Sequence, residues 1–220
     1  MRTAVVAASL LIMAACSNGS EGSGPVASSS TTALTIVPFS TVPNTTAPIT
    51  APDLPIEEAL RLGEGGLGRA RFGDSDTKVE GYLRAILLAP DDDTDWGKPD
   101  SAYGTCPGTE VRVLRWGWLV VFFADRSSFG AGRRHFIGWR YGPEVDTQAL
   151  YPEGLSTALG LAPGMTVRDL KKTFEATELT PARGSRPPGF RIGESFRGSL
   201  TGLGDDDVVV VVEAGADCPL

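Results

Sequence analysis

Few residues in this chain could act as a nucleophile or a base, because it contains a single histidine, His135. Ser75 is the serine that first suggests chemistry, since it stands in the stretch FGDS at residues 72–75. A serine hydroxyl attacks a carbonyl group only when a neighbouring base takes its proton and a third group orients that base. Ser75 would therefore act only if the chain also supplied both of these groups.

The FGDS stretch resembles the serine motif of the GDSL-type esterases. That resemblance implies two further groups, an asparagine in the oxyanion hole and a late Asp-x-x-His that supplies the base. The only asparagines are Asn18 and Asn44, which lie in a low-complexity stretch, and Gly132 stands where the aspartate before His135 should be. Ser75 thus lacks the partners of an activated nucleophile, and we expect no serine catalysis.

Carboxylates are the catalytic type in good supply, since the chain contains 27 aspartates and glutamates. A paired-carboxylate hydrolase needs two such groups about 5–9.5 Å apart, and no pair in the sequence stands out. The aspartates at residues 91–95 alternate as calcium ligands do, but Trp96 replaces the glycine and Ala102 the final glutamate of a calcium loop. We expect solvated loops there and at residues 205–207, with no metal and no cofactor.

The first residues have the pattern of an export signal: Arg2, an apolar segment at residues 4–14, and the sequence MAAC ending at Cys16. Two alanines before a cysteine resemble the lipobox of bacterial lipoproteins. The resemblance implies that residues 1–15 are a signal peptide and that Cys16 carries lipid, which would hold the protein on the extracytoplasmic side of the cell membrane. The alternative is an ordinary secretory signal with an incidental cysteine.

Residues 16–52 are rich in Ser, Thr, Pro, Ala and Gly and predict a lipidated, disordered tether that holds the folded part away from the membrane. The chain has a formal net charge of −7, which argues against a nucleic-acid partner. Besides the membrane, the expected partner is a protein or polymer of the cell envelope. The sequence leaves the oligomeric state open.

The two cysteines other than Cys16 predict a disulfide. Cys106 and Cys218 are an even pair in a compartment where disulfides persist. In the chain-entropy description, closing so long a loop stabilises the fold by up to about 4–5 kcal/mol.

A local repeat explains Ser75 better than catalysis does. The stretch GDSDTKV at residues 73–79 is echoed by GMTVRDL at residues 164–170, and both read Gly-x-Ser/Thr-x-x-x-aliphatic. Each hydroxyl residue precedes apolar residues at helical spacing. We therefore expect Ser75 and Thr166 to be helix N-caps.

Three strand-like runs follow each helix, which predicts an α+β fold made of two tandem repeats, residues 53–145 and residues 146–220. Each repeat would be a turn, a helix and three antiparallel strands. Together they would form one compact domain, with a six-stranded sheet or two abutting sheets and the helices packed on one face.

This pattern resembles exported bacterial proteins built from helix-plus-antiparallel-sheet units. The paired Gly-x-Ser/Thr helix starts, the strands after them and Cys16 carry the likeness, which covers most of residues 60–218 as architecture. The β-lactamase-inhibitory-protein-like domains are such tandem repeats, as are similar units in uncharacterised actinobacterial lipoproteins. The resemblance implies an exported α+β domain.

Two strand-like runs, WLVVFF at residues 118–123 and VVVVV at residues 208–212, do not alternate apolar and polar residues. Something must therefore cover the second face of the sheet. Either the protein buries this face itself, or aromatic residues there, with Trp118, Trp139 and Tyr141 as candidates, form a surface for a partner. The leading expectation is a non-enzymatic, lipid-anchored binding module, and the alternative is a carboxylate-based hydrolase acting on envelope material.

Overall fold

The computed structural model describes residues 54–143 and 152–219, which belong to one compact unit, Ala47–Leu220. The expected signal peptide, the tether, Cys16 and the expected repeat boundary after residue 145 lie outside the described residues. Within those residues, no helix is both long and apolar enough to cross a membrane.

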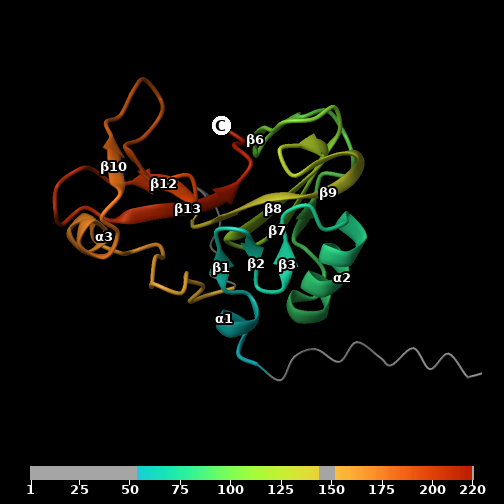
Figure 1. Ribbon diagram of the computed structural model, residues 1–220, viewed down its shortest axis with the longest axis horizontal. Helices are drawn as coiled ribbons and strands as arrows, with labels where there is room; N and C mark the ends of the chain where they lie inside the picture. The colour runs from blue at the N-terminus through green and yellow to red at the C-terminus, as the bar shows by residue number, and fades with distance from the viewer. Residues whose placement is uncertain (1–53, 144–151, 220) are drawn as a thin grey trace, which may run out of the picture. The chain divides into compact units, whose positions relative to one another are not determined.

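One antiparallel sheet of eight strands runs through the unit (Figure 1). Its strand order is β10-β11-β12-β13-β9-β8-β7-β4, so β9 and β13 pair at its centre. We call the four strands from β10 to β13 the C-terminal half of the sheet and the other four the N-terminal half. The strands are β4 (Asp92–Asp93), β7 (Val111–Trp116), β8 (Leu119–Ser127), β9 (Gly130–Tyr141), β10 (Thr177–Thr180), β11 (Gly189–Ile192), β12 (Phe196–Leu200) and β13 (Val209–Gly215).

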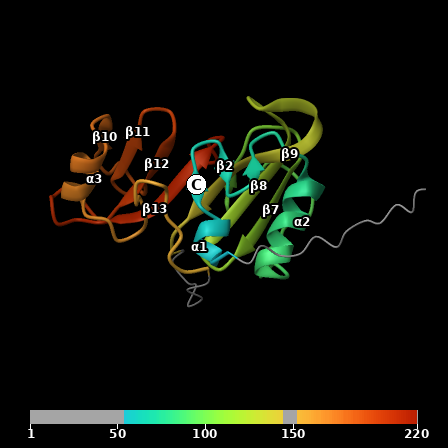
Figure 2. The same cartoon turned by 60° about the horizontal axis from the view of Figure 1, so that its bottom comes forward.

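Shorter elements lie on both sides of this sheet. Figure 1 shows the three-stranded sheet β1-β2-β3 with α1 and α2 on one side, and β6 on the other, and Figure 2 shows β2, α1 and α2 in front of the large sheet. The small strands are β1 (Leu62–Gly63), β2 (Gly66–Leu67), β3 (Ala70–Arg71), β5 (Asp100–Ser101) and β6 (Gly104–Thr105). The helices are α1 (Ile56–Ala59), α2 (Asp76–Leu87) and α3 (Val167–Thr173).

The expected fold of two helix-plus-three-strand repeats is wrong. The described chain is mostly β, and its large sheet is one continuous antiparallel array with three strands on either side of the β9–β13 pair. The two strands that the sequence did not predict are the edges, β4 and β10. Neither contains a run of apolar residues, and each forms because its backbone pairs with the neighbouring strand, β7 or β11.

Both longer helices bury their apolar residues against the same side of the large sheet. In α2, Val79, Leu83 and Leu87 recur at helical spacing and are buried, as are Val167 and Leu170 in α3. These side chains belong to one cluster that also contains aromatic residues of the sheet. The sheet members of the cluster include Trp116, Phe123, Phe136, Trp139, Tyr141 and Phe190.

The two Gly-x-Ser/Thr turns share a backbone hydrogen-bonding pattern. The Gly73 N–H donates to the Phe136 carbonyl, and the Phe136 N–H donates to the Asp74 carbonyl. The second turn makes the same pair of bonds with Val209, from the Gly164 N–H and to the Met165 carbonyl. The echo in the sequence therefore marks how each helix start attaches to β9 or β13.

The two expected N-caps differ in their side-chain bonds. Both Ser75 and Thr166 occupy the N-cap position with extended backbone. The Thr166 hydroxyl accepts a hydrogen bond from the Asp169 N–H at 3.1 Å, whereas the Ser75 hydroxyl makes no cap bond and lies 3.5 Å from the Thr77 hydroxyl. The prediction that Thr166 caps its helix is confirmed. For Ser75, the N-cap position is confirmed but the side-chain hydrogen bond is not.

Replacement of the two hydroxyl residues should therefore have unequal effects. We expect Thr166→Ala to lower the free energy of unfolding by about 1 kcal/mol, because a first-turn N–H loses its acceptor. Ser75→Ala should lower it by clearly less. Urea unfolding of the two variants, followed by far-ultraviolet circular dichroism, measures both changes, and an equal loss would contradict the difference between the caps.

Candidate functional site

Two of the three aromatic residues expected on an exposed binding face are buried. Trp139 is 1% exposed, and its indole N–H donates to the Gly66 carbonyl at 2.9 Å. Tyr141 is 2% exposed, and its hydroxyl donates to the Pro152 carbonyl at 2.8 Å. Trp118 is half-buried, with its ring centroid 6.0 Å from that of Tyr141. The prediction that Trp139 and Tyr141 contact a partner is wrong, because both are core residues.

The strand β8 lacks alternation because both of its faces are covered. Leu119, Val121 and Phe123 belong to the cluster on the helix side. The intervening residues point to the opposite side and belong to a second buried cluster, to which Tyr103 also contributes. The members from β8 are Val120, Phe122 and Ala124. In this half of the sheet the protein buries its own second face.

The cover over the N-terminal half is the segment at residues 98–106, which we call the disulfide loop. Cys106 at its end is bonded to Cys218, so the predicted disulfide is confirmed. The Thr105 N–H also donates to the Pro219 carbonyl. The disulfide thus ties the loop before β7 to the segment that follows β13.

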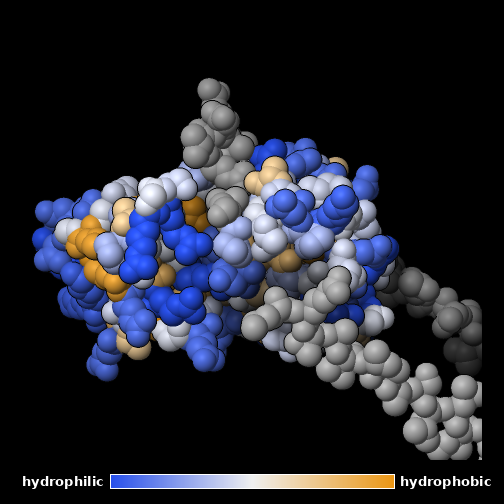
Figure 3. Space-filling model, turned by 90° about the horizontal axis from the view of Figure 1, so that it is seen from above, coloured by the Kyte–Doolittle hydropathy of each residue, from blue (hydrophilic) through white to orange (hydrophobic). Residues whose placement is uncertain are grey.

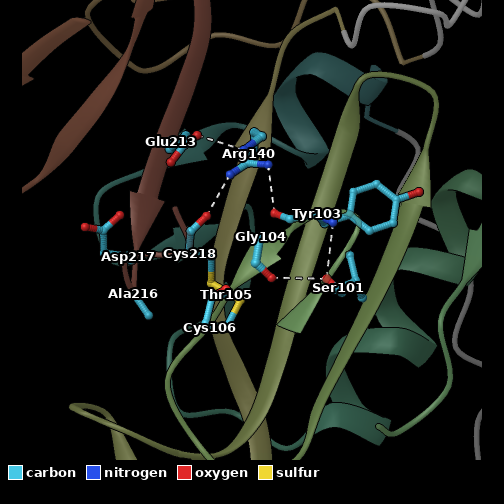
Figure 4. Close-up of a disulfide and its surroundings, with 12 residues drawn as sticks. Ser101, Tyr103, Gly104, Thr105, Cys106, Arg140, Glu213, Ala216, Asp217 and Cys218 are labelled. Carbon is cyan, nitrogen blue, oxygen red and sulfur yellow. Dashed lines mark hydrogen bonds and ion pairs between the residues drawn. A yellow bond between two sulfur atoms is a disulfide. The ribbon is translucent and has the colours of Figure 1, made fainter. Parts of the chain in front are cut away.

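A buried arginine at the centre of the sheet holds the same parts together (Figure 4). Arg140 of β9 is 4% exposed and donates from Nε to the Glu213 carboxylate of β13 at 2.7 Å. Its other nitrogens donate to the carbonyls of Tyr103 at 3.1 Å and Cys218 at 3.0 Å. Arg140 therefore joins the two halves of the sheet to the disulfide loop and the C-terminal segment.

Among residues 54–143 and 152–219, no buried cluster of this kind covers the corresponding face of the C-terminal half of the sheet. None of the eight residues that it presents there is buried, whereas most of the equivalent residues of β7 and β8 are, including Val113, Val120 and Phe122. We call this surface the open face. It consists of Glu178, Thr180, Gly189, Arg191, Arg197, Ser199, Val211 and Glu213.

Figure 3 views the molecule from the side of this face. Hydrophobic residues lie there among strongly hydrophilic ones, over the part of the molecule that contains β10–β13. Val210 and Val211 are half-buried, so the run VVVVV is not wholly covered by described residues. A surface that combines apolar and charged groups in this way suits a protein contact.

Charged residues form a row across the open face. Glu178, Arg191, Arg197 and Glu213 lie directly opposite one another on successive strands, and Arg140 continues the row on β9. Two arginines are therefore neighbours. Side chains directly opposite in an antiparallel pair lie within about 5.5 Å at Cβ, so like charges there destabilise the sheet.

Only one of the two neighbouring arginines is neutralised. Arg197 Nε lies 3.3 Å from the Glu213 carboxylate and 3.4 Å from that of Asp217, and its guanidinium donates to the Gly215 carbonyl at 3.0 Å. The exposed Arg191 has no side-chain partner among residues 54–143 and 152–219. Glu178 lies opposite Arg191 on β10 but forms no ion pair with it. Within the described residues, the open face thus carries one exposed arginine without an ion pair beside one that has ion pairs.

The structure brings His135 to a serine, although not to Ser75. The Ser127 hydroxyl lies 2.8 Å from Nε2 of His135, and Nδ1 lies 2.7 Å from the Arg133 carbonyl. Because a carbonyl only accepts, the hydrogen-bond network assigns the proton to Nδ1 and lets Ser127 donate to Nε2. The β8–β9 hairpin creates this pair, which the sequence analysis missed.

The Ser127–His135 pair lacks the other parts of a hydrolase site. The Ser127 hydroxyl accepts a bond from the Phe129 N–H at 3.0 Å, and His135 is fully buried. Two hollows of about 300 and 490 Å³ lie elsewhere, around α1, and Ser127 lines neither. The pair therefore supports the hairpin, and neither of these two hollows brings a substrate space to it.

Two carboxylates that share Arg112 are also unsuited to acid–base catalysis. Arg112 of β7 binds Glu80 of α2 at 2.8 Å and also binds Asp93 of β4. Burial alone would raise the pKa of Glu80, but hydrogen bonds from Arg112 and Arg84 outweigh it and lower the pKa. The bond from Arg112 likewise lowers the pKa of Asp93. Neither group is a general acid, which needs a raised pKa.

Metal ligands are not grouped within the part of the chain that the structure describes, where no three His, Cys, Asp or Glu residues could hold an ion. In the acidic stretch, the Asp91 carboxylate accepts from the Gly117 N–H at 2.6 Å, and the Tyr103 hydroxyl donates to Asp92 at 2.5 Å. Asp205 and Asp206 lie near Arg168 and Lys171. These aspartates therefore hold loops in place.

The signal that could have located the open face is alternation in the last strands. In GFRI and SFRGSL, the residues Phe190, Ile192 and Leu200 face the helix-side cluster. The intervening residues Arg191 and Arg197 face the other side. Strict alternation of apolar and polar residues predicts one solvated face. The run WLVVFF lacks this alternation, and comparing it with GFRI and SFRGSL would have located the open face.

Arg112, Glu80 and Asp93, which we call the Arg112 cluster, make the free energy of unfolding depend on pH. The pKa values of Glu80 and Asp93 are lowered in the folded state, so their contribution is present above the ordinary pKa of about 4 and is lost as the pH falls below it. We expect the free energy of unfolding to fall less steeply with acid in the variant Glu80→Gln/Asp93→Asn. Urea titrations between about pH 7 and pH 2 test this.

Asp206→Asn is the control for this titration, because the Asp206 side chain is 90% exposed. We expect this variant to keep the acid slope of the parent. If the double variant also keeps that slope, the Arg112 cluster does not cause it.

A serine-directed probe tests the alternative reading of Ser127. We expect a fluorophosphonate to leave this residue unlabelled, because His135 is fully buried and its Nδ1 faces a backbone carbonyl in place of a carboxylate. Ser127→Ala should cost about 1–3 kcal/mol of stability, because the buried Nε2 of His135 would lose its donor. Peptide mass spectrometry and urea unfolding measure the two effects. Labelling of Ser127 that His135→Ala abolishes would instead identify an activated nucleophile.

No protein-family model, curated protein or solved structure matches the chain. The resemblance to β-lactamase-inhibitory-protein-like domains therefore stays an expectation from the sequence. The function has to be argued from the arrangement of the residues, and the open face is the feature of the described surface that the fold itself does not use.

Proposed function

We propose that the protein is a lipid-anchored binding module of the cell envelope, which binds a partner protein through the open face of β10–β13. The observation that supports this most directly is the contrast within one sheet. The N-terminal half is covered by the disulfide loop, while the same side of the C-terminal half has no buried residue. A sheet face with a half-buried valine and an exposed arginine offers both apolar area and directed hydrogen bonds.

The position of the open face suits a tethered module. The described chain begins just before α1, which lies on the helix side of the sheet, and Figure 1 shows α1 on the side opposite to β6. The expected lipid at Cys16 would then leave this face available to partners.

Paired variants test the proposed function. The test variant, Thr180→Glu/Ser199→Glu, places two charged side chains on the open face, where both residues reach solvent. The control variant, Thr77→Glu/Ser128→Glu, makes the same changes at exposed residues outside it. Each is made in the mature chain, residues 16–220 with Cys16→Ser, and is used as bait in a native envelope extract from the source cell.

We expect a protein that the parent and the control variant retain and the open-face variant loses. Mass spectrometry identifies it, and the affinity of the purified partner for each variant then measures the loss. Equal retention by all three chains would refute binding through the open face. Retention of a polysaccharide in place of a protein would refute the class of partner.

A further inference from the structure

We infer that the hairpin of β10 and β11 selects a partner protein with a carboxylate-rich surface, an inference that rests on the proposed function. Three arginines support this inference, and we call them together the arginine hairpin. Arg183 and Arg186 lie at the tip of the β10–β11 hairpin, and Arg191 lies on the open face. All three are exposed, and none has a side-chain partner among residues 54–143 and 152–219.

The backbone holds the two arginines at the tip next to each other. The Arg183 N–H donates to the Arg186 carbonyl at 3.1 Å, and the Arg186 N–H donates to the Arg183 carbonyl at 3.0 Å. They form an antiparallel bridge across a two-residue turn, in which Gly184 has a φ of 58°. Their side chains therefore leave the hairpin on the same face.

The arginine hairpin thus takes part in two pairs of like-charged neighbours. Arg183 lies opposite Arg186, and Arg191 lies opposite Arg197 on β12, with Glu178 as its neighbour on β10. Like charges directly opposite each other destabilise a sheet. A bound carboxylate between such arginines would remove the repulsion and accept paired N–H bonds from a guanidinium, the geometry for which arginine is suited.

The charge of this hairpin contrasts with that of the chain. The chain has a net charge of −7, and several of its other arginines bind carboxylates, as Arg112 binds Glu80 and Arg140 binds Glu213. A positive hairpin on an acidic protein attracts an acidic partner while the rest of the surface repels it. The partner is therefore directed to one orientation.

The composition of the tip favours a protein over a membrane. Residues 181–187 are all exposed and contain no large apolar side chain that could enter a lipid layer. None of the exposed large hydrophobic residues lies on this hairpin; they are Leu54, Leu88, Phe129, Leu159 and Leu203. Pro181 and Pro187 flank the tip and restrict its backbone, which lowers the entropy cost of binding a protein surface.

The experiment measures affinity for a carboxylate-rich polypeptide, poly-L-glutamate, by isothermal titration calorimetry. The protein is the mature chain, residues 16–220 with Cys16→Ser. The test variant Arg183→Gln/Arg186→Gln/Arg191→Gln is compared with the control Arg61→Gln/Arg69→Gln/Arg126→Gln. The control removes the same charge from exposed arginines that also lack a side-chain partner within the described residues.

We expect the test variant to bind poly-L-glutamate at least about tenfold more weakly than the parent, and the control to stay within roughly twofold. The test variant should unfold at the same or a higher temperature than the parent, because its like-charged neighbours are gone. Equal weakening in both variants, or no binding by the parent, would overturn the inference. Tighter binding of the parent to phosphatidylglycerol vesicles than to poly-L-glutamate would overturn it in favour of a lipid surface.

The captured partner separates this inference from the proposed function. If Arg183→Gln/Arg186→Gln/Arg191→Gln loses the partner that the control variant Thr77→Glu/Ser128→Glu retains, the inference is supported. If the triple variant retains the partner while Thr180→Glu/Ser199→Glu loses it, the inference fails and the proposed function stands. If the open-face variant retains the partner as well, the proposed function has failed.

Discussion

The pairing of β9 with β13 is the contact on which the rest of the described fold depends, because it joins the two halves of the large sheet. Four residue pairs form this ladder, and Arg140 lies opposite Glu213 within it. A buried guanidinium is tolerated only when charge and hydrogen bonds compensate its loss of water, and Arg140 has a carboxylate and two carbonyl partners. The central ladder therefore also positions the disulfide loop.

The same constraint accounts for the asymmetry of the sheet. After β13, the chain turns toward the disulfide loop, where Cys218 is bonded to Cys106 and Pro219 accepts from Thr105. A segment fixed there cannot also extend across β11 and β10. The disulfide thus holds the segment after β13 beside the loop that covers the N-terminal half. The exposure of the C-terminal half follows from this connectivity of the chain.

Sequence patterns predicted the features that depend on residue type and missed those that depend on pairing. Cysteine number identified the disulfide, and helical spacing after a hydroxyl residue identified the cap at Thr166. The edge strands β4 and β10 contain no apolar run, so only their backbone partners define them. Trp139 and Tyr141 were assigned to the wrong environment because register, including a bulge near Phe122, decides which face a strand residue occupies.

A stable sequence normally agrees with its fold at every level, so a local conflict calls for a reason outside stability. Elsewhere in this molecule the charges agree with the fold, since Arg112 joins α2 to β4 through carboxylates. In the arginine hairpin, Arg191 lies opposite Arg197 on one side and Glu178 on the other, and it makes no ion pair within the described chain. This conflict lies on the one large sheet face that the described protein leaves open. A partner that brings carboxylates to this face would both neutralise the neighbouring arginines and cover the open sheet face with a single contact.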